Sequence, residues 1–413
     1  MTNIYDELKW RGLFHQDTAG TEAFFRAQPS LIVYAGFDPT AESLHVGNLI
    51  PLLTLKRFAD KGHKVIGLLG GATALIGDPS GRSTERNLST IEEVHARSQK
   101  IISQLKHFLP ESSILNNFDW IQPLNLIEFL RDIGKHFSIS EMLHRDSIST
   151  RLSQGISFTE FSYMLLQAYD FYFLAKEHGC QVQVGGSDQC GNITSGIELT
   201  KKKLGKTVHG LTLPLITSSN GQKLGKTVDG AIWLDPDKTT PYAFYQYWLN
   251  TDDHDAIKFC RLFTALSQEH LADVEIAAKS TPESRISQHL LAEQLTCLVH
   301  GKKASEEASL ASKALFENGD LSTLPIDSWQ MLMKTLPHAV CTSAINLPEA
   351  MIAVGLVKSK GEASRDIASG GLSLNGEKVK DPKQTVSPHY HHRFALIRKG
   401  KKSYACLEFS SQP

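Results

Sequence analysis

The chain has 413 residues, of which 41% are hydrophobic, 21% charged and 8% aromatic. This is the composition of a globular protein of two or three domains, and it excludes disordered, collagen-like and disulfide-rich classes. Lys and Arg number 43 against 44 Asp and Glu, so the net charge of −1 gives no sign of a nucleic-acid partner for the chain as a whole.

The sequence also predicts the compartment. None of the six cysteines forms a Cys-x-x-Cys pair or lies at zinc-finger spacing from histidines, so we expect reduced thiols and no metal bound by the protein. The N-terminus lacks the basic and apolar regions of a secretory signal. The longest apolar stretch, residues 65–77, is shorter than the roughly 20 residues of a transmembrane helix. We therefore expect a cytoplasmic protein.

The first half of the sequence alternates short apolar runs with amphipathic stretches. Strands are predicted at 31–34, 64–69 and 181–184, and helices at 49–60, 90–108, 158–177 and from about 191. Thr90 with Glu93, and Ser157 with Glu160, have the spacing of capping boxes. Strands that alternate with helices predict an α/β domain with a Rossmann-like parallel sheet over residues 1–228.

The second half has a different pattern. Helical patterns such as 255–266 and 283–300 replace strands, which predicts a helical domain over 229–325. Residues 317–345, which include Pro325 and Pro337, have the composition of a linker with at most short structure, and we place the linker itself at 326–345. Residues 337–413 are expected to be folded, because Asn375-Gly376 between apolar runs predicts a hairpin.

Charge divides the chain unevenly. Residues 337–413 hold eleven Lys and Arg against six Asp and Glu, whereas the rest of the chain holds 32 basic and 38 acidic residues. A basic terminal domain on an acidic body indicates a polyanion as the partner of that domain.

Polar and glycine-rich loops follow the first two predicted strands. Residues 34–40 lead to His45-Val46-Gly47-Asn48 at a helix start, where free N–H groups suit an anion, although His45 could merely cap the helix. Residues 70–82 lack the Gly-Lys-Ser/Thr ending of a Walker A loop. In this loop Asp78 could bind an ammonium group or close an Asx-turn. Arg82 and Arg86 are either a phosphate clamp or solvated loop charges.

The helix at 158–177 has a polar stripe. Tyr163, Gln167 and Asp170 lie within about 60° of one another around its axis, so they share either a ligand-binding face or an exposed polar face. Gln183, Asp188 and Gln189 lie at a strand's carboxyl end, where open α/β sheets bind ligands.

A last polar segment, Lys223-Leu224-Gly225-Lys226-Thr227, places two lysines around a glycine. Lysines in such a loop can stabilise charge on a phosphate during transfer, but a solvated basic turn is the alternative.

In order and spacing these segments resemble the bacterial tyrosyl-tRNA synthetases, which are class I aminoacyl-tRNA synthetases. His45-Val46-Gly47-Asn48 resembles the HIGH signature, and residues 223–227 resemble the KMSKS signature. Residues 34–40, 70–81, 158–170 and 185–192 are similar to the family's tyrosine and nucleotide loops. The chain from about 346 is similar to an S4-type RNA-binding domain, which implies a small α+β domain over residues 346–413. The resemblance covers essentially the whole chain. It departs at Asn48 (His in the signature), at Cys190 (Trp is expected) and at Ala35 (Cys is frequent).

The resemblance implies a tyrosine–tRNA ligase that forms tyrosyl-adenylate from tyrosine and ATP and then charges tRNA(Tyr). Mg²⁺ would accompany ATP, without a metal tightly bound by the protein, and the chain would be a homodimer bridged by tRNA. Tyrosine would be bound at its phenol by Tyr34 and Asp170, at its amino group by Asp78, Tyr163 and Gln167, and near its carboxylate by Gln183 and Gln189. ATP would be bound by Gly36, Asp38, Thr40, His45, Gly47, Asn48, Gly186 and Asp188, and pyrophosphate by Arg82, Arg86, Lys223, Lys226 and Thr227. Candidate tRNA contacts are Lys358, Lys360, Arg365, Lys378, Lys380 and Arg398.

Two alternatives remain at this point, and a third is excluded. A tryptophan enzyme of the same class would keep the fold, but Tyr34 and Asp170 suit a phenol. A catalytically silent RNA-binding protein could reuse the scaffold, whereas a nucleotide-binding oxidoreductase lacks its Gly-x-Gly-x-x-Gly helix start. The histidines at 389, 391 and 392 could bind a metal, although a solvated loop is favoured.

Overall fold

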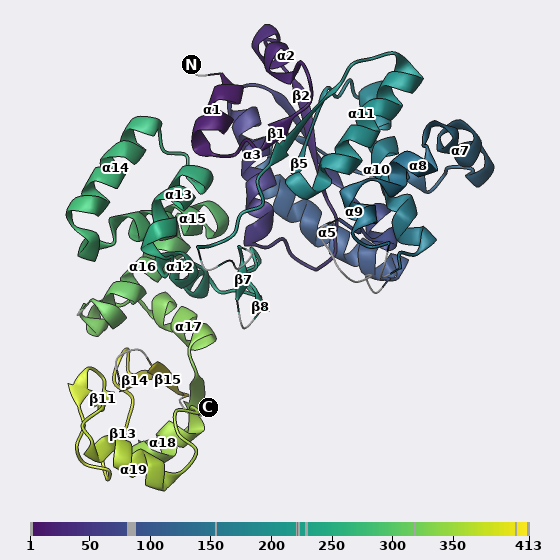
Figure 1. Cartoon of the computed structure of the whole chain (residues 1–413). Helices are drawn as coiled ribbons and strands as arrows, with labels where there is room; N and C mark the ends of the chain where they lie inside the picture. Colours follow the sequence, from purple (N-terminus) through teal and green to yellow (C-terminus); the bar gives the residue numbers. More distant parts are fainter. Residues whose placement is uncertain are drawn as a thin grey trace. The chain divides into compact units, whose positions relative to one another are not determined.

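The computed structural model describes residues 3–80, 88–152, 155–219, 221, 224–227, 230–317, 319–400 and 403–410. The chain divides into two compact units, Met1–Trp233 with Arg261–Ala265, and Leu234–Cys260 with Leu266–Pro413. Figure 1 shows their elements coloured along the chain. Within the described ranges, no helix has both the length and the apolar character needed to cross a membrane.

A six-stranded sheet in the order β1-β6-β5-β2-β3-β4 forms the centre of the first unit. Its strands are β1 (Gln16–Asp17), β2 (Ile32–Phe37), β3 (Lys64–Leu69), β4 (Ser113–Asn116), β5 (Val182–Gly186) and β6 (His209–Leu213). Only β1 runs antiparallel to its neighbour, so the predicted parallel α/β sheet is confirmed. The three strands predicted from apolar runs are β2, β3 and β5, whereas β4 was not predicted.

Helices pack on this sheet because its strands are buried apolar runs. The longer ones are α1 (Ile4–Arg11), α2 (Thr21–Ala27), α3 (Leu49–Asp60), α5 (Ile91–Phe108), α10 (Phe158–Glu177) and α11 (Cys190–Leu204). Short helices are α4 (Thr73–Ile76), α6 (Phe118–Ile121), α7 (Leu126–Asp132), α8 (Ile139–Leu143) and α9 (Asp146–Ser149), and β7 (Lys226–Thr227) and β8 (Gly230–Ala231) form a hairpin. α3 contacts β2, β3 and β5, and α11 contacts β5 and β6. The predicted helices at 49–60 and 158–177 have the observed bounds.

The two predicted capping boxes differ. At the start of α5 the box is complete, because Thr90 Oγ1 accepts from Glu93 N at 3.2 Å and Glu93 Oε2 accepts from Thr90 N at 3.1 Å. At the start of α10, Ser157 caps the helix, but the carboxylate of Glu160 accepts from Arg151 Nη2 at 2.9 Å instead. Glu160 is fully buried, and a buried carboxylate requires a paired charge. The predicted second box was therefore wrong in its reciprocal half.

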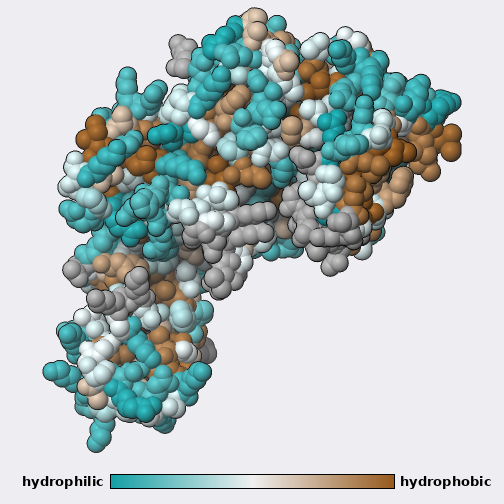
Figure 2. All heavy atoms as spheres, viewed as in Figure 1, coloured by the Kyte–Doolittle hydropathy of each residue, from teal (hydrophilic) through white to brown (hydrophobic). Residues whose placement is uncertain are grey.

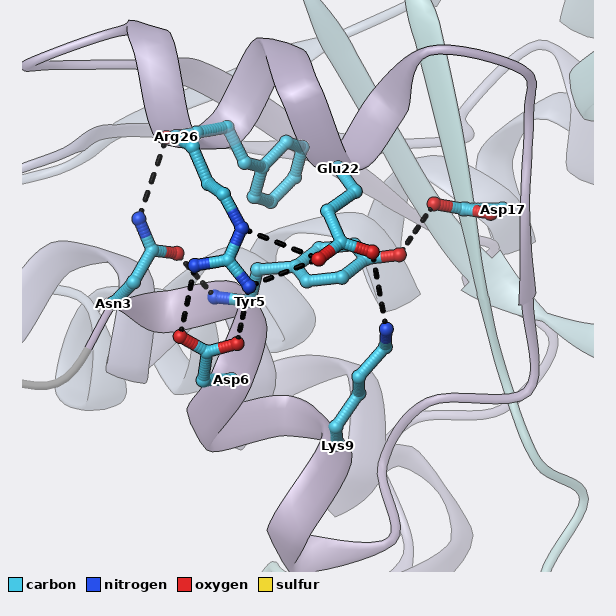
Figure 3. Close-up of polar contacts among 8 residues, drawn as sticks. Asn3, Tyr5, Asp6, Lys9, Asp17, Glu22 and Arg26 are labelled. Carbon is cyan, nitrogen blue, oxygen red and sulfur yellow. Dashed lines mark hydrogen bonds and ion pairs between the residues drawn. The ribbon is translucent and has the colours of Figure 1, made fainter.

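The N-terminal helices are fastened to each other and to the edge strand (Figure 3). Arg26 on α2 pairs with Asp6 of α1 at 2.7 Å and with Glu22 at 2.9 Å, while the buried Tyr5 donates to Asp17 of β1 at 2.7 Å. Burial and the Asp17 carboxylate raise the pKa of Tyr5, so its hydroxyl stays a donor. Exposed ion pairs contribute only about 0–1 kcal/mol each, so Tyr5 is the stronger anchor.

The second unit combines helices with a smaller sheet. Its helices are α12 (Pro241–Leu249), α13 (Asp253–Phe263, whose last residues belong to the first unit), α14 (Gln268–Ser280), α15 (Ile286–His300), α16 (Lys302–Phe316), α17 (Ile326–Thr335), α18 (Leu347–Ala353) and α19 (Lys360–Ala368). The sheet has the order β12-β11-β14-β15-β9, with β9 (His338–Cys341), β11 (Leu372–Leu374), β12 (Glu377–Lys378), β14 (Phe394–Lys399) and β15 (Ser403–Phe409). A separate pair is β10 (Ile345–Asn346) with β13 (Thr385–Val386). Asn375 and Gly376 join β11 to β12 with φ of 52° and 90°, which confirms the predicted hairpin.

Residues 317–345 were expected to have at most short structure, and this expectation was wrong. The segment contains the ten residues of α17, with Trp329 fully buried, and strand β9, which pairs with β15. Trp329 stacks on Tyr390 and Phe394, with ring centroids 4.6 and 5.6 Å apart. The prolines that suggested a linker instead flank the helix, since Pro325 is its N-cap.

The histidine-rich turn before β14 has a structural role. His391 Nε2 lies 2.7 Å from the carbonyl oxygen of Leu324, so this ring joins the turn to the residue that precedes α17. In the parts of the chain that the structure describes, no group of three or more His, Cys, Asp or Glu side chains is placed to bind a metal ion.

Candidate active site

The first unit contains a cavity of about 680 Å³ at the carboxyl ends of β2, β3 and β5. This is the edge of a parallel sheet at which ligands bind. The predicted site residues that line it are Tyr34, Gly36, Asp38, Thr40, His45, Asn48, Asp78, Tyr163, Gln167, Asp170, Gln183, Gly186, Asp188 and Gln189. The structure thus brings together three loops and one helix face that are far apart in the sequence.

At one end of the cavity a hydroxyl and a carboxylate are buried together. Tyr34 on β2 is 1% exposed, and its hydroxyl has no hydrogen-bond partner among the described residues. Asp170 on α10 accepts from Asn117 Nδ2 at 3.0 Å and from Trp120 Nε1 at 2.8 Å. Burial raises the pKa of Asp170 to about 7, against the opposing effect of these two hydrogen bonds. Burial and the nearby Asp170 also raise the pKa of Tyr34.

A second group of polar side chains is already hydrogen-bonded. Gln189 Nε2 donates to Asp78 Oδ2 at 2.7 Å, and the hydroxyl of Tyr163 donates to Asp38 Oδ2 at 2.9 Å. Asn192, which was not predicted, donates to Gln167 Oε1 at 2.9 Å. Because Tyr163 and Asp170 are buried against the cavity, the alternative of an exposed polar face on α10 was wrong.

The His45 segment forms a tight turn before α3. His45 Nδ1 accepts from Gly47 N at 3.0 Å, and Asn48 Oδ1 accepts from His45 N at 3.0 Å, so the two side chains cap the short 3₁₀ helix Val46–Asn48. His45 therefore caps the turn and also lines the cavity. Gly47 is absent from the cavity lining, and a Cβ on it would lie 2.8 Å from the imidazole of His45.

The hairpin of β7 and β8 packs against this turn. Gly225 has a φ of 77°, and a Cβ on it would lie 3.0 Å from Val46 Cβ and 3.2 Å from Gly47 N. The backbone continues the contact, since Ile232 N donates to Gly225 O and Val46 N donates to Ile232 O, both at 2.9 Å. The structure thus places the segment around Gly225 beside the His45 turn. Arg82, Arg86 and Lys223 lie outside the described residues, as do the side chains of Lys226 and Thr227.

The turn after β5 requires a glycine at position 186. A Cβ on Gly186 would lie 2.5 Å from Asp188 Oδ1, so a side chain there would displace this carboxylate. The 3₁₀ helix Ser187–Gln189 then leads into α11 at Cys190, which is half-buried. The turn presents Asp188 and Gln189 to the cavity.

Four functional candidates were missed by the sequence interpretation: Thr73, Asn117, Trp120 and Asn192. Asn117 is fully buried and directly follows β4. The sequence does contain a pattern that predicts Asn117 as a site residue. Ile114-Leu115 followed by two asparagines has the same strand-end pattern that identified the other loops.

Comparison with known proteins agrees with this geometry. The family model for class I tRNA synthetases (W and Y) matches residues 26–317, and the model for the tyrosine–tRNA ligase SYY-like C-terminal domain matches residues 328–407. Together, the fold and these models define a class I aminoacyl-tRNA synthetase.

Full-length relatives identify the family more closely. A tyrosine–tRNA ligase of Geobacillus kaustophilus is 46% identical over 99% of this chain and all of its own, and tyrosine–tRNA ligase 1 of Bacillus subtilis is 45% identical over the same shares. The crystal structure of a C-terminally truncated Aspergillus nidulans mitochondrial tyrosyl-tRNA synthetase is 32% identical, with a TM-score of 0.70 over 76% of this chain and 95% of its own. The chain belongs to the tyrosine–tRNA ligase family.

Proposed function

We propose that the cavity of the first unit binds tyrosine with its phenol at Tyr34 and Asp170 and its amino group near Asp78, Tyr163 and Gln167. The reaction is that of a tyrosine–tRNA ligase, in which tyrosine is activated by ATP and then joined to tRNA. The unpartnered hydroxyl of Tyr34 beside a buried carboxylate carries the assignment of the phenol end. A buried polar group without a partner costs free energy, which a ligand hydroxyl would recover.

A pocket of this kind would also select tyrosine over phenylalanine. A ring without a hydroxyl leaves the buried polar atoms unpaired, a rule for which tyrosyl-tRNA synthetases are themselves the standard example. Gln183 and Gln189 complete the pocket near the carboxylate in this proposal. Tryptophan would bring an indole N–H to the same atoms, but it is larger than a phenol.

Activation requires positioning and charge stabilisation more than acid–base chemistry. The tyrosine carboxylate attacks the α-phosphorus of ATP in line, and negative charge accumulates on the departing pyrophosphate. We assign the phosphates to the segment with Thr40, His45 and Asn48, and the ribose to Gly186 and Asp188, with Gly36 and Asp38 beside the nucleotide. The contact between the His45 turn and Gly225 supports a joint role for the lysines that flank Gly225.

Mg²⁺ fits this site as a partner of ATP. The described residues hold no group of three acidic, His or Cys side chains that could bind a metal ion by themselves. In this proposal the ion is bound mainly through the phosphates of ATP, where it neutralises charge.

We assign tRNA binding partly to the C-terminal domain, which comprises the five-stranded sheet, the β10–β13 pair and helices α18 and α19. Lys358, Arg365, Lys378 and Lys380 are exposed on it, where Lys side chains can contact phosphates. Two other candidates differ. Lys360 pairs with Glu349 at 2.7 Å, and Arg398 lies half-buried over the ring of Tyr404.

We also propose that the protein is a homodimer. Large apolar side chains are exposed from α7 to the start of α10, where Figure 2 shows apolar surface: Leu126, Ile127, Leu130, Ile139, Leu152 and Phe158. Phe158 is 79% exposed. Exposed apolar surface of this kind on a folded unit is typical of an interface. Sedimentation analysis of Phe158→Asp, which should shift the protein towards monomer, tests this assignment.

The function is tested by exchange of labelled pyrophosphate into ATP with each of the twenty amino acids. We expect tyrosine alone to support exchange. Exchange with tryptophan instead would move the protein to the other branch of its family, and absence of exchange with any amino acid would refute a catalytic role.

A further inference from the structure

Two of the carboxylates that line the cavity, Asp38 and Asp170, are joined by an unbroken series of hydrogen bonds. Tyr163 and Thr73 both donate to Asp38, at 2.9 and 2.8 Å. Asn117 Nδ2 lies 3.1 Å from Thr73 Oγ1 and 3.0 Å from Asp170 Oδ2. The series therefore runs from Tyr163 through Asp38, Thr73 and Asn117 to Asp170, where Trp120 adds a further donor.

The direction of each hydrogen bond in the series is fixed. The Asn117 amide oxygen accepts from Ala72 N at 2.7 Å, so its NH₂ group must face Thr73 and Asp170 and supply one hydrogen to each. An ionised carboxylate only accepts, so the hydroxyl of Thr73 donates to Asp38 and accepts from Asn117. Reorientation of the Thr73 hydroxyl or of the Asn117 amide would therefore break at least one hydrogen bond of the series.

The surroundings favour this arrangement. Thr73 and Asp170 are 2% exposed and Asn117 is fully buried, and hydrogen bonds are stronger, and unpaired groups more costly, away from water. Gly70 makes the central contact possible, because a Cβ on it would lie 1.8 Å from Asp38 Oδ1 and 2.4 Å from Thr73 Oγ1.

We propose that Thr73 and Asn117 form a relay that couples the two ends of the tyrosine pocket, with the Thr73 hydroxyl as the positioning group at its centre. The relay rests on the proposed function, because it takes the Tyr163 end as the amino-group site and the Asp170 end as the phenol site. Through it, a shift of Asp38 and Tyr163 changes the position of Asp170. A ligand that carries both an amino group and a phenol then binds more tightly than the separate contributions of the two ends would predict.

The test is a double-mutant cycle across the relay. Tyr163→Phe removes the donor at one end and Trp120→Phe the donor at the other, and kcat/KM for tyrosine is measured by pyrophosphate exchange for both single variants and the double variant. Tyr163 donates to Asp38 and Trp120 donates to Asp170, so the effects of the two changes would multiply if they were independent. We expect the double variant to depart from the product of the single effects by about threefold or more, as coupled network members do.

The same cycle is then repeated in Thr73→Val, which keeps the shape of the side chain and removes the hydroxyl, and in Thr73→Ser, which keeps the hydroxyl. We expect the coupling to fall below about twofold with valine and to be retained with serine. Thermal unfolding of each variant checks that the first unit is folded. If Thr73→Val does not fold, the cycle in the unmodified chain and in Thr73→Ser still decides the proposal.

Two outcomes overturn the relay: multiplicative effects in the unmodified chain, or equal coupling in Thr73→Val and Thr73→Ser. Both are read from an enzyme that exchanges pyrophosphate with tyrosine. Lack of that exchange in the unmodified chain would refute the proposed function instead, so the two failures are distinguishable.

Discussion

Replacing Tyr34 by phenylalanine removes one buried oxygen atom, which we propose binds the phenol of tyrosine. The hydroxyl is buried and has no partner among the described residues, so in the free protein it costs part of its desolvation penalty, about 1 kcal/mol or more. We therefore expect Tyr34→Phe to raise the unfolding temperature of the first unit by about 2–4 °C. The same change removes one neutral hydrogen bond to bound tyrosine, about 0.5–1.5 kcal/mol, so kcat/KM for tyrosine should fall about 2- to 13-fold.

The assay measures pyrophosphate exchange with tyrosine and with phenylalanine, together with thermal unfolding without ligand. Activity with phenylalanine should not fall, so selectivity drops by the same factor as tyrosine activity. Tyr5→Phe is a matched control, because Tyr5 is equally buried but donates to Asp17, and its loss should lower stability and leave tyrosine activity intact. A Tyr34→Phe protein that is less stable, or equally selective, would contradict the reasoning.

Three further changes test other parts of the molecule. Burial raises the pKa of Asp170 to about 7, so its carboxyl group binds a proton more tightly in the folded protein than in the unfolded chain. The free energy of unfolding of the unmodified protein, relative to that of Asp170→Asn, should therefore fall as pH rises from about 4 to 7 in urea unfolding experiments. A difference that does not change with pH would exclude the raised pKa. Arg151→Met leaves Glu160 charged and buried and should cost about 3–5 kcal/mol in urea unfolding, whereas Arg151→Met with Glu160→Leu should recover much of the loss. Chains that end at Leu336 or at Glu317 should both keep pyrophosphate exchange and lose tRNA charging, and unaltered charging would reject the RNA role of the C-terminal domain. The chain that ends at Leu336 keeps Trp329 but lacks the rings of Tyr390 and Phe394 that cover it, so its tryptophan fluorescence should be red-shifted relative to the shorter chain.

Local patterns predicted the elements whose causes are local. α3 and α10 were placed correctly because apolar periodicity and a cap at Ser157 act within a few residues. The same locality explains the two errors. Glu160 was predicted to cap its own helix, but its carboxylate accepts a hydrogen bond from the buried Arg151 instead. Two prolines suggested a linker, but Trp329 in this segment packs on rings about 60 residues further along the chain.

The site was predictable as a list of residues but not as a network. Strand-end loops and a helix stripe indicated which side chains face the cavity. The sequence could not show that Thr73 joins Asp38 to Asn117, because those contacts span 35 and 44 residues, and the contact from Asn117 to Asp170 spans 53. Such contacts depend on the order of strands in the sheet, which no local pattern encodes.

The polar atoms of the cavity differ in what they gain from a ligand. Where we place the amino group, Asp78, Tyr163 and Gln167 each have a partner within the protein, so an ammonium group would have to exchange or share existing hydrogen bonds. Where we place the phenol, Tyr34 Oη has no partner among the described residues, so a hydroxyl there adds a hydrogen bond to this atom without breaking one. On this assignment, the free energy that separates tyrosine from phenylalanine arises at the phenol end of the pocket, where Tyr34 Oη is unsatisfied in the free protein. The proposed relay through Thr73 would hold Asp170 in position beside it.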